Sequence, residues 1–176
     1  MRGADIPEIL KGNEGNMPLR YIKEKAFNDK KLISNDIVIE GSGGSPTQST
    51  GRTVFVTKKM LEKMENPIIC SNFCKILRTE KIEYSYLIFL FLQYLYKKDY
   101  FFQYENGTTG IKNLDINGIL ENAKIAIPLN IEIIISFNNL ITDLFEKIQS
   151  NGEQSKKLTQ IRDTLLPKLM NGEIDV

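Results

Sequence analysis

Apolar residues in the last quarter of the chain recur at the spacing of one helical face. From each to the next, the steps are three, four or sums of the two. Asn151-Gly152 is a turn signal, but the register continues through Asn151 and Ser155, which favours one continuous helix over a hairpin. The stripe consists of Phe137, Ile141, Leu144, Ile148, Leu158, Leu165 and Leu169.

A helix over residues 131–166 is roughly 55 Å long at about 1.5 Å per residue, and Pro167 is expected to kink or end it. Its apolar stripe has no partner within the same helix. We therefore expect this stripe to be buried against another part of the chain or against another protein.

The first three quarters of the chain predict short strands and helices in mixed order. Alternating, β-branched patterns predict strands over residues 36–40, 53–57, 73–78 and 124–127. Helical patterns cover residues 58–65, 83–98 and 114–120, whereas glycines and prolines make residues 1–18 look irregular. The fold class is therefore α+β, with a mixed domain over residues 1–128 and a long C-terminal helix over residues 129–176.

The amino-acid composition excludes several kinds of catalytic and metal site. The 176 residues include no histidine, which removes Ser-His and Cys-His nucleophile pairs and the commonest zinc ligand. Cys70 and Cys74 lack the spacing of a redox or zinc pair and are interpreted as buried apolar residues. We find no phosphate-binding loop, dinucleotide fingerprint or metal-ligand cluster, so neither a cofactor nor a metal is expected.

Net charge is +1, but residues 52–112 carry ten Lys and Arg against six Asp and Glu, so the middle of the chain is the better candidate to meet a polyanion. The most apolar run, residues 84–96, is too short to span a bilayer and predicts a buried helix. Free thiols without a signal peptide favour a cytoplasmic location.

Three segments follow one another in the order of the motifs of a known family. The first is Asp36-Ile37, Ser42-Gly43-Gly44-Ser45, Gly51-Arg52 and Ser71-Asn72-Phe73; the second is Asn106-Gly107-Thr108-Thr109-Gly110. The third is Arg162-Asp163-x-Leu165-Leu166-Pro167-Lys168-Leu169-x-x-Gly172-Glu173-Ile174. Together with Arg2-Gly3-Ala4-Asp5-Ile6-Pro7 and Ile125-Ala126-Ile127-Pro128, they resemble the specificity (S) subunit of type I restriction–modification enzymes.

This resemblance implies a DNA target-recognition domain with no catalysis of its own, followed by a spacer helix. S subunits bind double-stranded DNA and bring methyltransferase (M) and restriction (R) subunits to a bipartite site. They carry two recognition domains and two antiparallel spacer helices, whereas this chain has one of each, so it looks like a half-length subunit. Family domains usually start upstream of the Arg-Gly-Ala-Asp-Ile-Pro sequence, which implies that the first part of the domain is missing here.

A half-length subunit needs a second helix, and the simplest source is a second copy. We therefore expect a homodimer with an antiparallel coiled coil that reads a symmetric bipartite site. The dimer residues are Phe137, Ile141, Leu144, Ile148, Leu158 and Leu165.

The candidate DNA-binding residues are Ser42, Gly43, Gly44, Ser45, Gln48, Arg52, Lys58, Asn72, Thr108, Thr109 and Lys112. Each has a structural alternative: the glycine-rich loop is either a flexible connection or a phosphate contact, and Arg52 contacts either DNA or the preceding loop. Two other functions stay open. One is a protein-interaction module without DNA, and the other is a hydrolase in which Lys58 or Lys59 activates Ser42 or Ser45.

Overall fold

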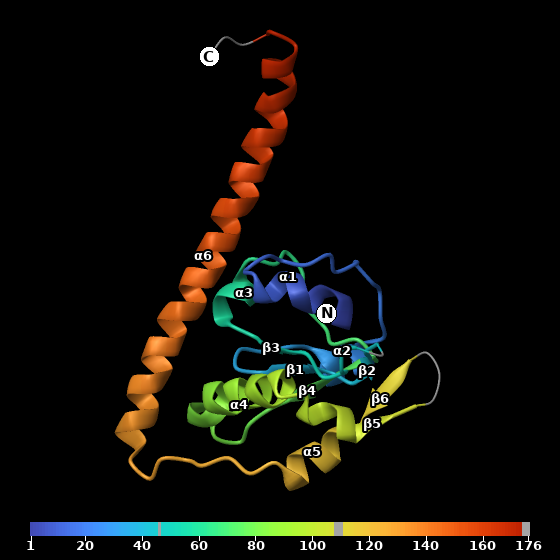
Figure 1. The fold of residues 1–176 in the computed structure, drawn as a ribbon, viewed down its shortest axis with the longest axis vertical. Coiled ribbons are helices and arrows are strands. Elements are labelled where there is room, and N and C mark those ends of the chain that lie inside the picture. The colour runs from blue at the N-terminus through green and yellow to red at the C-terminus, as the bar shows by residue number, and fades with distance from the viewer. Residues whose placement is uncertain (46, 108–110, 174–176) are drawn as a thin grey trace.

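An antiparallel sheet of three strands in the order β3-β1-β4 forms the centre of the domain in the computed structural model, which describes residues 1–45, 47–107 and 111–173 (Figure 1). The middle strand β1 (Ile37–Glu40) pairs with β3 (Thr53–Phe55) and β4 (Cys74–Leu77), so that Val38 faces Val54 on one side and Ile76 on the other. All four residues of β1 are buried. The alternating pattern of residues 36–40 therefore predicted the central strand correctly.

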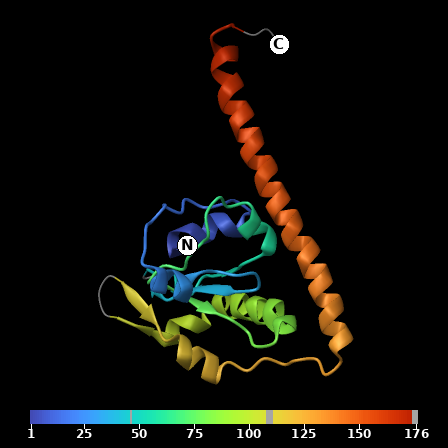
Figure 2. The same cartoon turned by 180° about the vertical axis from the view of Figure 1, so that it is seen from behind.

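Two hydrophobic cores lie on opposite faces of this sheet, because successive side chains of a strand point in opposite directions. Val38 joins the core beneath α1 (Ile6–Leu10) and α3 (Lys58–Glu62), which includes the buried Cys70 and Cys74, as predicted. Ile37 and Ile39 join the core beneath α4 (Ser85–Lys97), the helix predicted from the most apolar run. The two views in Figures 1 and 2 show these helices on the two sides of the sheet.

A second antiparallel sheet, in the order β2-β6-β5, lies at one end of the domain. Its strands are β2 (Ser42–Gly43), β5 (Glu105–Asn106) and β6 (Lys112–Leu114). The other elements are short: η1 (Gly3–Asp5), α2 (Glu24–Lys30), η2 (Ile82–Tyr84), η3 (Tyr100–Tyr104) and α5 (Ile116–Asn122).

Several boundaries differ from the sequence-based expectation. The glycine-rich loop contributes strand β2, and residues 112–114 pair as β6, so the helix expected from residue 114 begins at Ile116. The strand expected over residues 124–127 is absent among the described residues, because this segment runs between α5 and the last helix without a neighbouring strand to pair with. Residues 1–18 contain η1 and α1 rather than an irregular coil, and α2 was not predicted.

The C-terminal helix α6 (Ile131–Met170) is continuous across Asn151-Gly152, which confirms the prediction from its register. Asn130 caps its start by accepting a hydrogen bond from the backbone N–H of Glu132 at 2.9 Å. Of the two outcomes expected at Pro167, a kink or an end, the end is wrong, because the helix continues to Met170. The carbonyl that loses its bond to Pro167 lies on an exposed turn where water can reach it. The helix ends instead near Gly172, whose positive φ of 67° terminates helices readily.

Helix α6 has two halves with different surroundings. Up to residue 153 it runs along the side of the domain, and Ile134, Ile141 and Gly152 are buried there. Phe145 packs its ring against Phe55 and Phe89, with centroid distances of 5.9 and 5.7 Å. From residue 154 to 173 every side chain is exposed, and this half projects beyond the domain in both views (Figures 1 and 2).

Candidate nucleic-acid interface

Glu40, the last residue of β1, is a buried carboxylate approached by residues of the Arg2-Gly3-Ala4-Asp5-Ile6-Pro7, Ser42-Gly43-Gly44-Ser45 and Gly51-Arg52 sequences. Arg52 donates to it twice, from Nε to Oε2 at 2.9 Å and from Nη2 to Oε1 at 2.5 Å. Gly3 and Gly43 approach the same carboxylate so closely that a side chain on either would collide with it; a Cβ on Gly43 would lie 2.7 Å from Oε1. The motif residues Gly3, Gly43 and Arg52 therefore hold the domain together at this point.

Arg52 thus has a partner inside its own domain. Its guanidinium forms the two-bonded geometry that is the strongest common arginine–carboxylate pairing, and only 22% of the side chain is exposed. The partner is Glu40 of the neighbouring strand rather than the preceding loop. This geometry supports the structural alternative, and the DNA contact of Arg52 stays a prediction.

The glycine-rich loop is held by hydrogen bonds on both sides. Ser45 closes a tight turn with Gln48, because its backbone N–H donates to the Gln48 carbonyl at 2.8 Å and its Oγ accepts from the Gln48 N–H at 3.0 Å. Gly44 has a φ of +74° and lies against Thr50, where a Cβ would be 2.6 Å from Oγ1. The described part of the loop is therefore hydrogen-bonded within its own domain, and both the flexible connection and the phosphate contact stay predictions.

Lys112 braces this turn from strand β6. Its Nζ donates to the Ser45 carbonyl at 3.1 Å and to Glu105 Oε2 at 2.7 Å. Burial raises the pKa of Glu105, but the hydrogen bonds from Lys112 and from the Thr50 N–H outweigh it and hold that pKa below its ordinary value. At neutral pH the Glu105 carboxylate is charged and offsets much of the positive charge of Lys112.

An exposed edge runs from the glycine-rich loop to the Ser71-Asn72-Phe73 motif. The backbone N–H groups of Gly41 and Ser42 both donate to the Phe73 carbonyl, at 2.8 and 3.0 Å. Ser42 Oγ donates to Asn113 Oδ1 at 2.6 Å. Phe73 is 57% exposed and Asn72 is exposed beside it, so the structure brings two separate motifs to one surface.

A basic segment that the sequence analysis missed adjoins this edge. Lys30, at the end of α2, donates to Asn72 Oδ1, and Lys31 pairs with Ile69 as an isolated β-bridge. Tyr21 is 97% exposed. We call residues 20–31 the α2 edge. This segment carries two acids, Glu24 and Asp29, and five bases: Arg20, Lys23, Lys25, Lys30 and Lys31. The excess of bases over acids in this segment could have indicated a DNA-binding surface from the sequence. The segment lies outside residues 52–112, the region in which the sequence predicted contact with a polyanion.

The remaining predicted DNA-binding residues are not all placed together. Lys58 lies on α3, at the side of the domain next to α6 and away from β2, and forms an exposed ion pair with Glu62 at 3.5 Å (Figure 1). Gln48 is exposed in the glycine-rich turn. Thr108 and Thr109 lie outside the described residues.

Neither Ser42 nor Ser45 is arranged as a nucleophile in the part of the chain that the structure describes. Ser42 Oγ bonds to an amide, Ser45 Oγ accepts from backbone and Lys58 pairs with Glu62. Within the same residues no three His, Cys, Asp or Glu side chains are grouped as metal ligands. None of the described helices is both long and apolar enough to cross a membrane.

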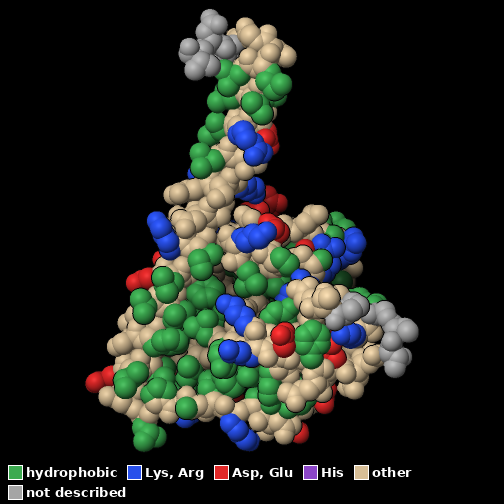
Figure 3. All heavy atoms as spheres, viewed as in Figure 1, with side chains coloured by type: hydrophobic (Ala, Val, Ile, Leu, Met, Phe, Trp, Pro, Cys, Tyr) green, Lys and Arg blue, Asp and Glu red, His purple; other side chains and the backbone are tan. Residues whose placement is uncertain are grey.

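The predicted dimer residues of α6 divide into two sets. Ile141 is buried against the domain of its own chain and Phe137 is half-buried, so Ile141 is not free to meet a second helix. Leu144, Ile148, Leu158 and Leu165 are exposed, and apolar side chains of the projecting half are visible in Figure 3.

Two curated proteins align with this chain. The specificity subunit of the type I restriction enzyme MjaIX from Methanocaldococcus jannaschii is 32% identical over 160 residues, which are 91% of this chain and 33% of that subunit. The specificity subunit of the type I restriction enzyme HindI from Haemophilus influenzae is 54% identical over 43 residues, 24% of this chain and 9% of that subunit. This chain is a homologue of type I restriction enzyme specificity subunits.

The homology confirms the resemblance read from the motifs. The alignment with the MjaIX specificity subunit covers most of the chain, so it includes the domain as well as the helix. The chain spans about a third of the length of that subunit. No protein-family model matches the chain.

Proposed function

We propose that this chain recognises a DNA sequence as the specificity subunit, or half of one, of a type I restriction–modification system. The observation that carries the proposal is the 32% identity with a specificity subunit over 91% of the chain. In this role the chain performs no chemistry and directs methyltransferase and restriction subunits to a bipartite site. Because these partners act on chromosomal DNA, the proposal includes a cytoplasmic location.

The surface that best fits DNA is the end of the domain that carries Ser42, Asn113, Asn72, Phe73 and Lys75, together with the adjoining α2 edge. It combines exposed amide and hydroxyl groups, which read bases or position phosphates, with lysines that neutralise phosphates. The buried pairs Arg52–Glu40 and Lys112–Glu105 lie behind this surface and fix its backbone. In the proposal, these four residues support the interface more than they contact bases.

We also propose that two copies pair through α6. The exposed apolar side chains of the projecting half have no partner among the residues that the structure describes, and a second α6 in antiparallel orientation would bury them. The dimer would place two recognition domains on one DNA duplex. The seam is formed by Leu158, Ile161, Leu165 and Leu169 of the projecting half, with Leu144 and Ile148 exposed on the half that lies along the domain.

The test is selection of bound duplexes from a random library, followed by fluorescence anisotropy at several salt concentrations. The double variant Phe73→Ala/Lys75→Ala should weaken binding, and losing one phosphate contact should lower the slope of log K against log salt by about 0.9. Lys58→Ala is the matched control, since Lys58 is equally basic but lies beside α6.

Enrichment of one two-part sequence supports the proposal. If neither the chain alone nor the chain with a type I methyltransferase subunit enriches any duplex, DNA recognition is excluded and the protein-interaction alternative takes its place. If Lys58→Ala weakens binding more than the double variant, the interface lies on the α3 side instead.

A further inference from the structure

The helix α6 and the N-terminal segment touch backbone to backbone at Gly152 and Gly12. Gly152 is buried, and a Cβ added to it would lie 2.5 Å from both the carbonyl carbon and the carbonyl oxygen of Gly12. Gly12 has a φ of +88°, and a Cβ on it would collide with the carbonyl oxygen of Ile148. Only glycine fits on either side of this contact. Gly152 in the Asn151-Gly152 pair therefore allows the helix to pack closely against the N-terminal segment and does not mark a turn.

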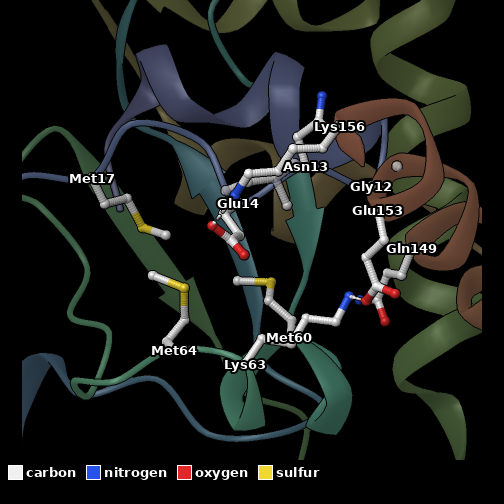
Figure 4. A pocket seen from close by; sticks show the side chains of 12 residues that line it. Gly12, Asn13, Glu14, Met17, Met60, Lys63, Met64, Gln149, Glu153 and Lys156 are labelled. Atoms are coloured by element: carbon white, nitrogen blue, oxygen red, sulfur yellow. Dashed lines mark hydrogen bonds and ion pairs between the residues drawn. The ribbon is translucent and has the colours of Figure 1, made fainter. Parts of the chain in front are cut away.

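Polar side chains surround this contact, as Figure 4 shows. Lys63 of α3 forms an ion pair with Glu153, and Gln149 Nε2 donates to Thr57 Oγ1 at 2.6 Å. On the far side, Lys156 reaches Glu14 at 3.2 Å. A small cavity of about 40 Å³ lies here, and its walls include Lys63, Gln149, Glu153, Lys156 and Glu14 together with Met17, Met60 and Met64. We call this set of contacts the upper joint.

A lower set of contacts holds the beginning of α6. Asn138 Nδ2 donates to the Glu83 carbonyl at 2.8 Å, and Phe145 packs into the aromatic cluster around Phe55. A rod fixed at one point can swing, whereas a rod fixed at two separated points has a defined direction. Among the described residues, the upper joint is the last close contact before the projecting half. Its outermost member, the Lys156–Glu14 pair, is exposed, and exposed pairs contribute little to stability.

We infer that the Gly12–Gly152 contact sets the direction of the projecting half of α6 relative to the recognition domain. Given the dimer and the bipartite site proposed above, on which this step rests, the same contact sets the spacing between the two DNA half-sites. Gly12 and Gly152 are thus positioning residues for the length of the DNA spacer. They touch no base.

The size of the effect follows from the lever arm. A methyl group on Gly152 must lie about 3.5 Å from its neighbours instead of 2.5 Å, so the helix shifts by about 1 Å at the joint. From Ile141 to Gly152 the helix rises about 16 Å, and from Gly152 to Leu169 about 26 Å more. A pivot at Ile141 therefore moves the helix end by roughly 2.6 Å. A leucine that displaces the joint by about 3 Å moves the end by roughly 8 Å, or about two base pairs at 3.4 Å each.

The experiment compares Gly152→Ala and Gly152→Leu with Gln154→Ala, an exposed position two residues further along the helix. Spin labels on cysteines introduced at Glu80 and Lys168 report the domain-to-helix distance by pulsed electron paramagnetic resonance. Labelled chains are diluted with unlabelled ones to remove distances between copies. In parallel, duplexes with half-sites at variable separation are selected by each variant.

We expect the label distance to change in the order Gly152→Leu, then Gly152→Ala, with Gln154→Ala unchanged. The preferred spacer should change by about two base pairs for Gly152→Leu. Alanine is a better helix former than glycine, so a change in Gly152→Ala is not caused by loss of helix. A folded Gly152→Leu with an unchanged label distance overturns the inference. If the label distance changes but the preferred spacer does not, the contact sets the direction of the helix but not the spacing of the half-sites. If the unmodified chain binds no DNA at all, the proposed function is overturned instead.

Discussion

Removing the Arg52 guanidinium should destabilise the domain because it leaves the Glu40 carboxylate buried without its charged partner. Only 4% of the Glu40 side chain is exposed, and two of its hydrogen bonds come from Arg52. Breaking a buried ion pair typically costs about 3–5 kcal/mol, and the partial exposure of Arg52 places the expected loss near 3 kcal/mol. For a chain of this size that corresponds to a fall in Tm of about 6–12 °C.

The assay is urea unfolding of Arg52→Ala, Glu40→Gln and the double variant Arg52→Ala/Glu40→Gln. Because the cost comes from an isolated charge, removing that charge as well should restore part of the stability. The double variant should therefore be more stable than Arg52→Ala by about 1 kcal/mol or more. Lys58→Ala is the control, since its exposed pair with Glu62 contributes at most about 1 kcal/mol.

The same variants separate the two roles left open for Arg52. If it is structural, Arg52→Ala loses stability and, below its unfolding transition, keeps most of its DNA affinity. The reasoning is refuted if Arg52→Ala unfolds within about 0.5 kcal/mol of the parent chain while losing DNA binding. In that case Arg52 contacts DNA and its pairing with Glu40 is replaced in the complex.

Three further outcomes follow from single features. Leu158→Glu/Leu165→Glu should convert the proposed dimer to a monomer in analytical ultracentrifugation. The Tm of the domain should not change, since both side chains are exposed within one chain. A monomeric parent chain would contradict the proposed dimer. Cys70 and Cys74 should react with a thiol reagent only on unfolding, because both are buried. Folding lowers the pKa of Glu105, so the charged carboxylate stabilises the fold fully above its ordinary pKa near 4.5, and this stabilisation is lost as pH falls below that value. In an acid titration, Glu105→Gln should therefore lose less stability below pH 4.5 than the parent chain.

The strands that sequence patterns predicted well are those whose neighbours are also strands. Residues 36–40 alternate between two buried faces, and that pattern survives because β1 lies between β3 and β4. The pattern over residues 124–127 is similar, yet no strand lies beside it. Local propensity does not reveal whether a pairing partner exists, which is a property of the whole fold.

The candidate site shows a comparable limit. The motifs correctly marked positions that meet in space, because Gly3, Gly43 and Arg52 all reach Glu40. The chemistry of Gly43 and Arg52 alone indicated DNA contacts, whereas their positions show a buried ion pair and a glycine packed against the Glu40 carboxylate. Glycine and arginine serve both purposes equally well. The Glu40 carboxylate decides between a structural role and a DNA contact for these residues. In the sequence it is only the last residue of a predicted strand, so its role as their partner could not be predicted.

The two ends of the stripe in the C-terminal sequence also differ in direction and in surroundings. A seven-residue repeat drifts by about 20° per repeat around a straight α-helix. Phe137 and Leu165 occupy the same repeat position four repeats apart, so they differ by about 80° in direction. The first part of the stripe lies along its own domain, where Ile141 is buried, whereas the last part lies beyond the end of the domain and is exposed. If a second helix pairs with the projecting half, the drift must be removed by left-handed supercoiling there. The half that is docked on the domain has no such requirement.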